Sequence, residues 1–385
     1  MPAMRNPTIA VGLQIGTQPP LSALRAFLVG ARAMRLDSVM VIDHFQNVFP
    51  SAIWDRELTW LAAQRPSPHE FFEYQVLLGY LASRVGAMRL GVGVTEPIRR
   101  HPLLIAQAMM TLSHLTARPP ILGIGAGERM NIDPYGLDPA GAVTRLEEAL
   151  SIIRQCFDGR GPITFSGRHF RLTQARMDLK PAGGRTPEIW IAGHGPRMLE
   201  LTGRYGDGWY PAAVASPEDY AARLAQVRAA ATAAGRDPTS ITPALHRFMV
   251  VAGTDSEVQA MLRTKVIRAF GLMAPADLWR RVGAVHPFGE DFNPLVDFVP
   301  DRYDRQTMDQ AIAAVPASVM TEGPLLSGTP SAITVTLQAF AEAGMRHVVL
   351  APISGLVSKR AALYGLWATG RIARALREQP YPDTG

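Results

Sequence analysis

Residues 120–131 have the sequence PILGIGAGERMN, and the predicted fold is built around this stretch. Its apolar run, Ile121–Ile124, contains β-branched residues and is too short for a helix, which indicates a buried strand. The glycines in and after the run let another backbone or a flat ring approach closely. Glu128 would then stand at the rim of whatever the strand opens into. Taken alone, the stretch fits a glycine-rich turn with a solvated acid equally well.

The same alternation of buried strand and amphipathic helix recurs along the chain. Strands are predicted at residues 8–13, 38–42, 89–94, 121–124, 188–192, 207–210, 241–252 and 346–350. Helices are predicted between them, one of them over residues 69–85, and Ser22, Pro102, Ser216 and Thr329 mark four of the starts. Eight strand–helix units without a dinucleotide fingerprint after the first strand predict a TIM (β/α)8 barrel, with residues 1–385 as one domain, rather than a doubly wound sheet.

Two segments interrupt this rhythm. Residues 158–185 form a hydrophilic excursion with several glycine turn signals. Residues 255–328, after the seventh strand, are partly helical and rich in aromatic residues. The second segment is large enough to build a lid or a pocket wall.

Composition limits the functions to consider. The chain has 385 residues, 47% hydrophobic composition and a net charge of +6, and its basic residues are scattered, which argues against nucleic acid as a partner. The single Cys156 excludes an internal disulfide framework and fits a small apolar filler in a reducing cytoplasm better than a nucleophile. No apolar run has the length of a signal peptide or a membrane span, so we expect a soluble cytoplasmic protein.

Chemistry in such a barrel is expected at the carboxyl ends of the strands. The residues at those ends are Asp43, His44, Thr95, Glu96, Glu128, Gly193, His194, Gly195, Trp209 and Tyr210. No histidine pair has metal-ligand spacing, no serine sits on a nucleophile elbow and no lysine ends a strand. Groups that transfer protons are therefore present without an electron source, which predicts a bound redox cofactor and no metal.

Each of these groups also has a simpler interpretation. His44 can give or take a proton at neutral pH, or it can only cap its loop by pairing with Asp43. Glu128 can act as a second proton donor. The glycines around His194 precede a helix whose first amides can hold a phosphate, but an ordinary turn fits as well, and Arg197 can neutralise that anion or be solvated.

At this point the ordered set of motifs resembles a known family. SVMVIDHF (38–45), RLGVGVTE (89–96), ILGIGAGERMN (121–131), EIWIAGHGP (188–196) and GDGWYP (206–211) resemble the luciferase-like flavin and deazaflavin oxidoreductases over nearly the whole chain. Further stretches, such as PYGLDPAGAVTRLEEAL (134–150) and HPFGEDF (286–292), resemble the coenzyme F420-dependent branch, and most of all the mycobacterial phthiodiolone ketoreductases.

The resemblance implies roles for particular residues. His44 and Glu128 would be the proton-handling residues beside a deazaflavin ring that Asp43 contacts. Gly93 and Val94 would form a bulge with a cis peptide behind the ring. The remaining cofactor contacts implied in this way are Gly125, Ala126, Gly127, Asn131, Ala192, Gly193, His194 and Gly195, the last four around the phosphate. Sugar-phosphate dehydrogenases of this branch carry tryptophan near the position of Val48, so a sugar phosphate is not expected.

Three functions follow as hypotheses. The first is a ketone reductase that uses reduced F420 on a lipid or polyketide-type ketone, to which the aromatic loop 45–60 is suited. The second is an FMN-dependent monooxygenase, and the third is a non-catalytic barrel that binds a lipid or deazaflavin. The basic, amphipathic last helix, residues 358–377, can dock on a membrane or simply cover the barrel. The resemblance also implies a homodimer.

Overall fold

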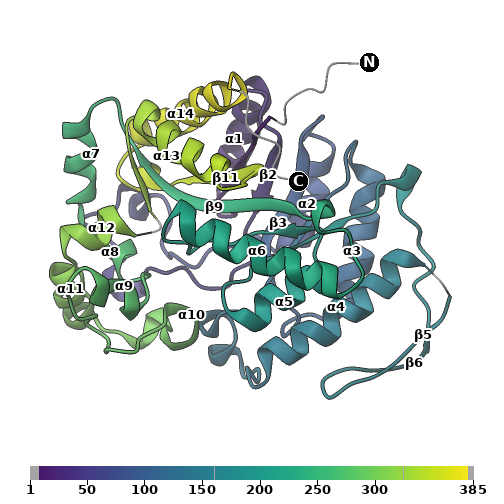
Figure 1. Ribbon diagram of the computed structural model, residues 1–385. Helices are drawn as coiled ribbons and strands as arrows, with labels where there is room; N and C mark the ends of the chain where they lie inside the picture. The colour runs from purple at the N-terminus through teal and green to yellow at the C-terminus, as the bar shows by residue number, and fades with distance from the viewer. Residues whose placement is uncertain (1–7, 160, 324, 380–385) are drawn as a thin grey trace.

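A closed barrel of parallel strands forms the centre of the computed structural model, which describes residues 8–159, 161–323 and 325–379 (Figure 1). The barrel strands are β1 (Ala10–Ile15), β2 (Ser38–Val41), β3 (Arg89–Thr95), β4 (Ile121–Ile124), β7 (Glu188–Ile191), β8 (Gly208–Trp209), β9 (Thr242–Val251) and β11 (His347–Pro352). Each strand pairs with the next, and the β8–β9, β9–β11 and β11–β1 pairings close the circle. The predicted (β/α)8 barrel is confirmed.

The helices lie outside this barrel and bury their apolar faces on it. The ring consists of α1 (Leu21–Ala33), α2 (Tyr74–Ala82), α3 (Pro102–Leu115), α4 (Ala142–Asp158), α5 (Pro196–Tyr205), α6 (Pro217–Ala233), α13 (Pro330–Glu342) and α14 (Lys359–Arg377). Ser216 and Thr329 cap α6 and α13 as predicted. Cys156 is buried on α4, and burial raises its pKa to about 11, as suits an apolar filler.

Two predicted helix starts are wrong. Ser22 lies inside the first turn of α1, because Pro20 already holds the extended conformation that precedes the helix. The helix predicted from residue 69 begins only at Tyr74, because the Glu73 side chain accepts a hydrogen bond from the Val76 amide and so caps α2 there.

The hydrophilic excursion contains two strands that the sequence did not indicate. β5 (Ile163–Ser166) and β6 (Arg171–Ala175) form an antiparallel pair outside the barrel (Figure 1). Ile163 and Leu172 are buried while most of their neighbours are exposed. Strands this short carry only one or two apolar positions each, so their period-two pattern could not be separated from a loop.

Residues 255–328 pack on the loop that follows β2. They contain α7 (Asp255–Leu262), α8 (Lys265–Gly271), α9 (Ala276–Arg281), α10 (Pro294–Asp297), α11 (Arg305–Ala314), α12 (Ala317–Glu322) and β10 (Leu326–Gly328), which pairs with β9. Phe49 and Phe270 meet edge to face with ring centroids 5.5 Å apart and belong to an apolar cluster separate from the barrel core. The segment therefore covers the side of the barrel where the β2 loop lies, and its role as lid or pocket wall stays a prediction.

Short 3-10 turns complete the connections. They are η1 (Ser51–Ile53), η2 (Trp60–Ala63), η3 (Arg129–Asn131), η4 (Asp133–Tyr135), η5 (Ala182–Gly184), η6 (Pro238–Ser240), η7 (Pro300–Arg302) and η8 (Ile353–Leu356). The close backbone approach expected along β4 is present, since a Cβ atom on Gly123 would lie 2.2 Å from the carbonyl oxygen of Val92 on β3.

Candidate active site

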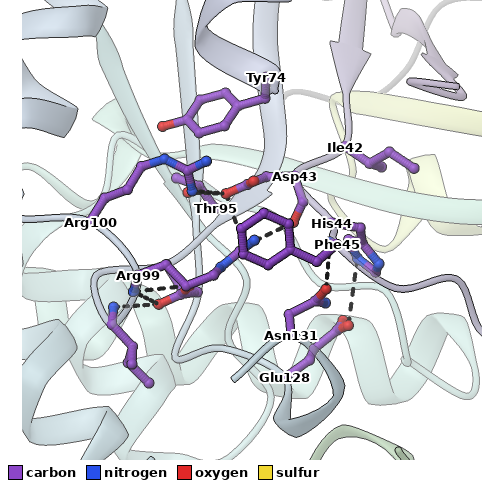
Figure 2. A network of polar contacts seen from close by, with 12 residues as sticks. Ile42, Asp43, His44, Phe45, Tyr74, Thr95, Arg99, Arg100, Glu128 and Asn131 are labelled. Atoms are coloured by element: carbon purple, nitrogen blue, oxygen red, sulfur yellow. Dashed lines mark hydrogen bonds and ion pairs between the residues drawn. The ribbon is translucent and has the colours of Figure 1, made fainter. Parts of the chain in front are cut away.

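The loop that follows β2 is held in place by the segment that follows β4 (Figure 2). The Asn131 Oδ1 atom accepts hydrogen bonds from the backbone amides of Phe45 at 2.8 Å and Gln46 at 3.1 Å. Asn131 is buried, so both bonds are shielded from water. His44 is thereby fixed in front of the end of β4, and Asn131 positions a loop in addition to any cofactor contact.

His44 and Glu128, predicted as the proton-handling residues, face one another. The His44 Nε2 atom lies 3.5 Å from the Glu128 Oε2 atom (Figure 2). The His44 Nδ1 atom lies 3.0 Å from the carbonyl oxygen of Gln46, and because a carbonyl only accepts, Nδ1 carries a hydrogen. The Nε2 and Oε2 atoms are therefore the two polar atoms of the pair that face one another. Their side chains are 22% and 33% exposed, so a ligand above the barrel can reach both atoms.

Asp43 is the centre of a buried ionic network. Its Oδ2 atom accepts hydrogen bonds from the Thr95 hydroxyl at 2.7 Å, Arg99 at 2.9 Å and Arg100 at 2.8 Å (Figure 2). The side chain is only 4% exposed. One carboxylate oxygen thus ties the end of β2 to the end of β3 and to the loop before α3, and Asp43 acts here as an anchor.

Arg99 and Arg100 were missed at the sequence level. Arg99 also pairs with Glu96, and its guanidinium carbon lies 5.0 Å from the centre of the Phe45 ring. Arg100 continues to Glu73 at 3.0 Å. The adjacent arginines before the Pro102 helix start were visible, but nothing in a linear pattern assigns them to a carboxylate on another strand.

The predicted bulge behind the site is present in β3. The pairing of β3 with β4 shifts register between Val92 and Thr95, and the Gly93–Val94 peptide is cis, as the resemblance implied. A Cβ atom on Gly93 would lie 3.2 Å from the Tyr210 hydroxyl, and one on Gly125 would lie 3.5 Å from a methyl group of Val94. The glycines therefore bring the ends of β3 and β4 close together and let Tyr210, after β8, approach β3 across the barrel.

The turn after β7 carries the residues predicted to hold a phosphate. Gly193 is fixed by the indole of Trp209, which donates to its carbonyl oxygen at 2.9 Å. The His194 Nδ1 atom is buried without a hydrogen-bond partner among the described residues. Burial, assisted by Arg223 and Arg247, lowers the pKa of His194 to about 4, so its imidazole is neutral at pH 7.

The helix start next to this turn is open. Gly195 is the N-cap of α5 and has no side chain to occupy the first amides, and a Cβ atom on it would meet nothing within 4 Å. Arg197 pairs with Glu147 at 3.1 Å and with the Thr144 hydroxyl at 3.0 Å, so its charge is engaged at the surface of α4.

These features fit a flavin-type group that carries a phosphate. The unpartnered His194 nitrogen and the uncapped helix start offer donors to an anion. The glycines of β3 and β4 leave a strand end without side chains, over which a flat ring can lie, and the His44–Glu128 pair stands at its edge. Within the described residues, no group of three histidine, cysteine, aspartate or glutamate side chains is arranged to hold a metal ion.

Fold and site together define a parallel (β/α)8 barrel with an acid–base pair at the carboxyl ends of its strands and a phosphate-type turn beside it. A family model described as luciferase-like monooxygenase matches residues 8–347. The chain belongs to this family.

Two curated relatives from Mycobacterium tuberculosis are similar in sequence. A phthiodiolone/phenolphthiodiolone dimycocerosates ketoreductase is 41% identical over 335 residues, which cover 86% of this chain and 88% of the relative. An F420-dependent hydroxymycolic acid dehydrogenase is 36% identical over 223 residues, 56% of each chain. The names of both relatives indicate that this chain is an oxidoreductase.

A solved structure confirms the fold independently. The coenzyme F420-dependent tetrahydromethanopterin reductase from Methanopyrus kandleri superposes with a TM-score of 0.74 at 19% identity, over 96% of this chain and 99% of that one. No helix among the described residues combines the length and the apolar character that crossing a membrane requires.

Proposed function

We propose that this protein is a coenzyme F420-dependent reductase that transfers hydride from the reduced deazaflavin to a ketone of a lipid or polyketide type. The observation that carries the proposal is the His44–Glu128 pair, 3.5 Å apart at the strand ends. The names of the two mycobacterial relatives, a ketoreductase and an F420-dependent dehydrogenase, support both the reaction and the cofactor.

Residues from four strand ends would hold the cofactor. Gly93, Val94 and the stretch Gly125–Gly127 would lie against the deazaflavin ring, and Asp43 and Asn131 would fix the loop at its edge. The turn Ala192–Gly195 would bind the phosphate through the first amides of α5 and His194. When bound and reduced, the deazaflavin supplies a hydride.

The chain itself supplies the proton. As the ketone carbon gains hydride, its oxygen becomes an alkoxide that must be protonated. A proton on His44 Nε2 or on Glu128 Oε2 can be delivered to that oxygen, while Nδ1 keeps its own hydrogen on the Gln46 carbonyl. Asn131 keeps the imidazole in place during the transfer, since it binds both amides that follow His44.

The surroundings of the pair suit an apolar substrate. Phe45 and Tyr135, each 43% exposed, pack beside the pair with ring centroids 4.6 Å apart and ring planes tilted by 45°. The helix α10, which contacts η3, exposes the apolar side chains of Leu295 and Val296. A ketone on an aliphatic chain would bury apolar area here, whereas a phosphorylated sugar would leave its charge against these groups.

Cofactor titration separates this proposal from its alternatives. Binding of F420 and of FMN would be followed through the fluorescence of Trp209, whose indole binds the phosphate turn. Tight F420 binding, followed by oxidation of the reduced cofactor when a long-chain ketone is added, supports the proposal. Preference for FMN with consumption of oxygen would replace it by the monooxygenase function, which the family description favours. F420 binding without turnover of any ketone would leave the non-catalytic function.

A further inference from the structure

One face of the last helix is both apolar and strongly basic. The exposed residues spaced three or four apart along α14 form this face, and we name it the α14 face: Arg360, Leu363, Trp367, Arg371 and Arg374. Leu363 is 70% exposed and Trp367 47% exposed, although both are large apolar side chains. Both side chains keep a large part of their apolar surface in solvent, as is typical of an interaction site.

The charge of α14 is of one sign. Its sequence KRAALYGLWATGRIARALR contains five basic residues and no acidic one. The Arg371 guanidinium carbon lies 5.5 Å from the centre of the Trp367 ring, and the centre of the Tyr364 ring lies 5.2 Å from it. An exposed aromatic ring thus lies next to a cation, as in helices that lie in the interface of an anionic bilayer.

The neighbouring helix extends the apolar surface. α13 packs beside α14 at the top of the molecule as drawn in Figure 1 and exposes 66% of Val335. The opposite side of α14 is used by the barrel, where residues such as Leu366, Ile372 and Leu376 are buried. The helix α14 therefore carries two apolar stripes: one is buried against the barrel, and the α14 face is the other.

We propose that the α14 face docks this protein on the surface of an anionic lipid membrane. Lipid headgroups would pair with the arginines, and Trp367 and Leu363 would enter the boundary between headgroups and acyl chains. A second copy of the chain fits less well, because a two-fold contact would bring two acid-free sets of arginines together. Nucleic acid would satisfy the arginines but not an exposed leucine.

Docking through this helix would also orient the site. α14 begins directly after β11 and η8, so its first turn lies at the rim where the strands end. The Lys359 Nζ atom is 5.3 Å from the centre of the Trp60 ring, and the Trp60 indole donates to the Gly355 carbonyl at 2.9 Å, which joins this rim to the aromatic loop after β2. The barrel would therefore lie with one side on the membrane and its mouth beside it.

The test is sedimentation of the full-length protein with vesicles, without cofactor or substrate, so its outcome does not depend on the proposed function. Vesicles of phosphatidylcholine alone would be compared with vesicles containing phosphatidylglycerol. We expect binding only to the anionic vesicles. The double variant Arg371→Gln/Arg374→Gln should bind roughly 25-fold more weakly, about fivefold for each charge lost, and Trp367→Ala at least about tenfold more weakly.

Matched controls lie elsewhere on the surface. Arg168→Gln/Arg171→Gln removes two exposed charges from the β5–β6 pair, and Val76→Ala removes a 75% exposed apolar side chain from α2. Both should bind like the unaltered protein. Brominated lipids should quench tryptophan emission in the unaltered protein and not in Trp367→Phe.

Three results would overturn the proposal. The first is an absence of binding to phosphatidylglycerol vesicles, and the second is equal loss of binding in the control variants. The third is a change of molecular mass in solution when the α14 face is altered, since that would identify the face as an interface between copies.

Discussion

The His44–Glu128 pair gives the sharpest prediction. His44→Asn removes Nε2 but leaves a side-chain amide that can still donate to the Gln46 carbonyl, and Glu128→Gln keeps the size of the side chain while removing its charge. Loss of a positioned proton donor reduces the rate of a chemical step by about 10²- to 10⁴-fold. We expect a loss in this range from either substitution.

The distance between the two groups sets how strongly they act together. At 3.5 Å, a protonated imidazole and a carboxylate attract by about 1 kcal/mol in water and by about 5 kcal/mol at an effective dielectric constant of about 20. With side chains that are 22% and 33% exposed, we place the coupling toward the lower end of this range. Because each substitution breaks the same pair, the double variant should be within about threefold of the slower single variant.

The assay is a single turnover under anaerobic conditions. Reduced F420 bound to the enzyme would be mixed with a ketone, and the return of the visible absorbance of the oxidised deazaflavin would be timed. Glu200→Gln, an exposed carboxylate on α5, is the control and should leave the rate unchanged. A double variant whose loss equals the product of the two single losses would show that His44 and Glu128 act independently and would refute their joint role in proton transfer.

Three further predictions concern folding. Asn131→Ala leaves two backbone amides without their acceptor and should lower the free energy of unfolding in urea by about 2 kcal/mol; an unchanged midpoint would show that these bonds do not hold the loop. Gly123→Ala forces a Cβ atom to 2.2 Å from a carbonyl oxygen and should lower the free energy of unfolding by about 1–3 kcal/mol. Gly16→Ala, whose Cβ atom would meet nothing within 4 Å, should leave the free energy of unfolding nearly unchanged in the same titration. Burial, with a contribution from Arg89, lowers the pKa of His347 to about 3, so the unfolded chain, with an imidazole pKa of about 6.5, binds the proton first. The stability that this group contributes is complete above pH 6.5 and is lost as the pH falls toward 3. In urea titrations between pH 7 and pH 4, His347→Gln should reduce the slope of the unfolding free energy against pH by about one bound proton. An unchanged slope would contradict this.

The barrel could be predicted from the sequence because its information is local. A short apolar run indicates each strand, and apolar residues three or four apart indicate each helix. The eight strand–helix units could therefore be counted without knowledge of any tertiary contact. The proton pair was also accessible, because strand ends of a parallel barrel meet at one rim and both His44 and Glu128 directly follow a strand. The short β5–β6 pair was missed because its pattern spans too few residues.

The ionic network could not be predicted in the same way. Arg99 and Arg100 bind Asp43 across 56 and 57 residues of chain, and Asn131 reaches the Phe45 amide across 86. A carboxylate at a strand end looks the same in the sequence whether it contacts a ligand or anchors two arginines. Burial decides between the two, and burial depends on how neighbouring loops close over the strand end.

The site is therefore built from loops that hold one another rather than from strand ends alone. The β2 loop is fixed on one side by Arg99 and Arg100, which bind Asp43, and on the other by Asn131. His44 lies between these two attachments, one residue after Asp43 and one before Phe45. Its distance to Glu128 is consequently set by two independent restraints, and loosening either one should displace the imidazole while the barrel remains intact. The resemblance assigns all of these residues to one cofactor site. In this protein some of them would contact the reactants, and the others hold those contacting residues in position.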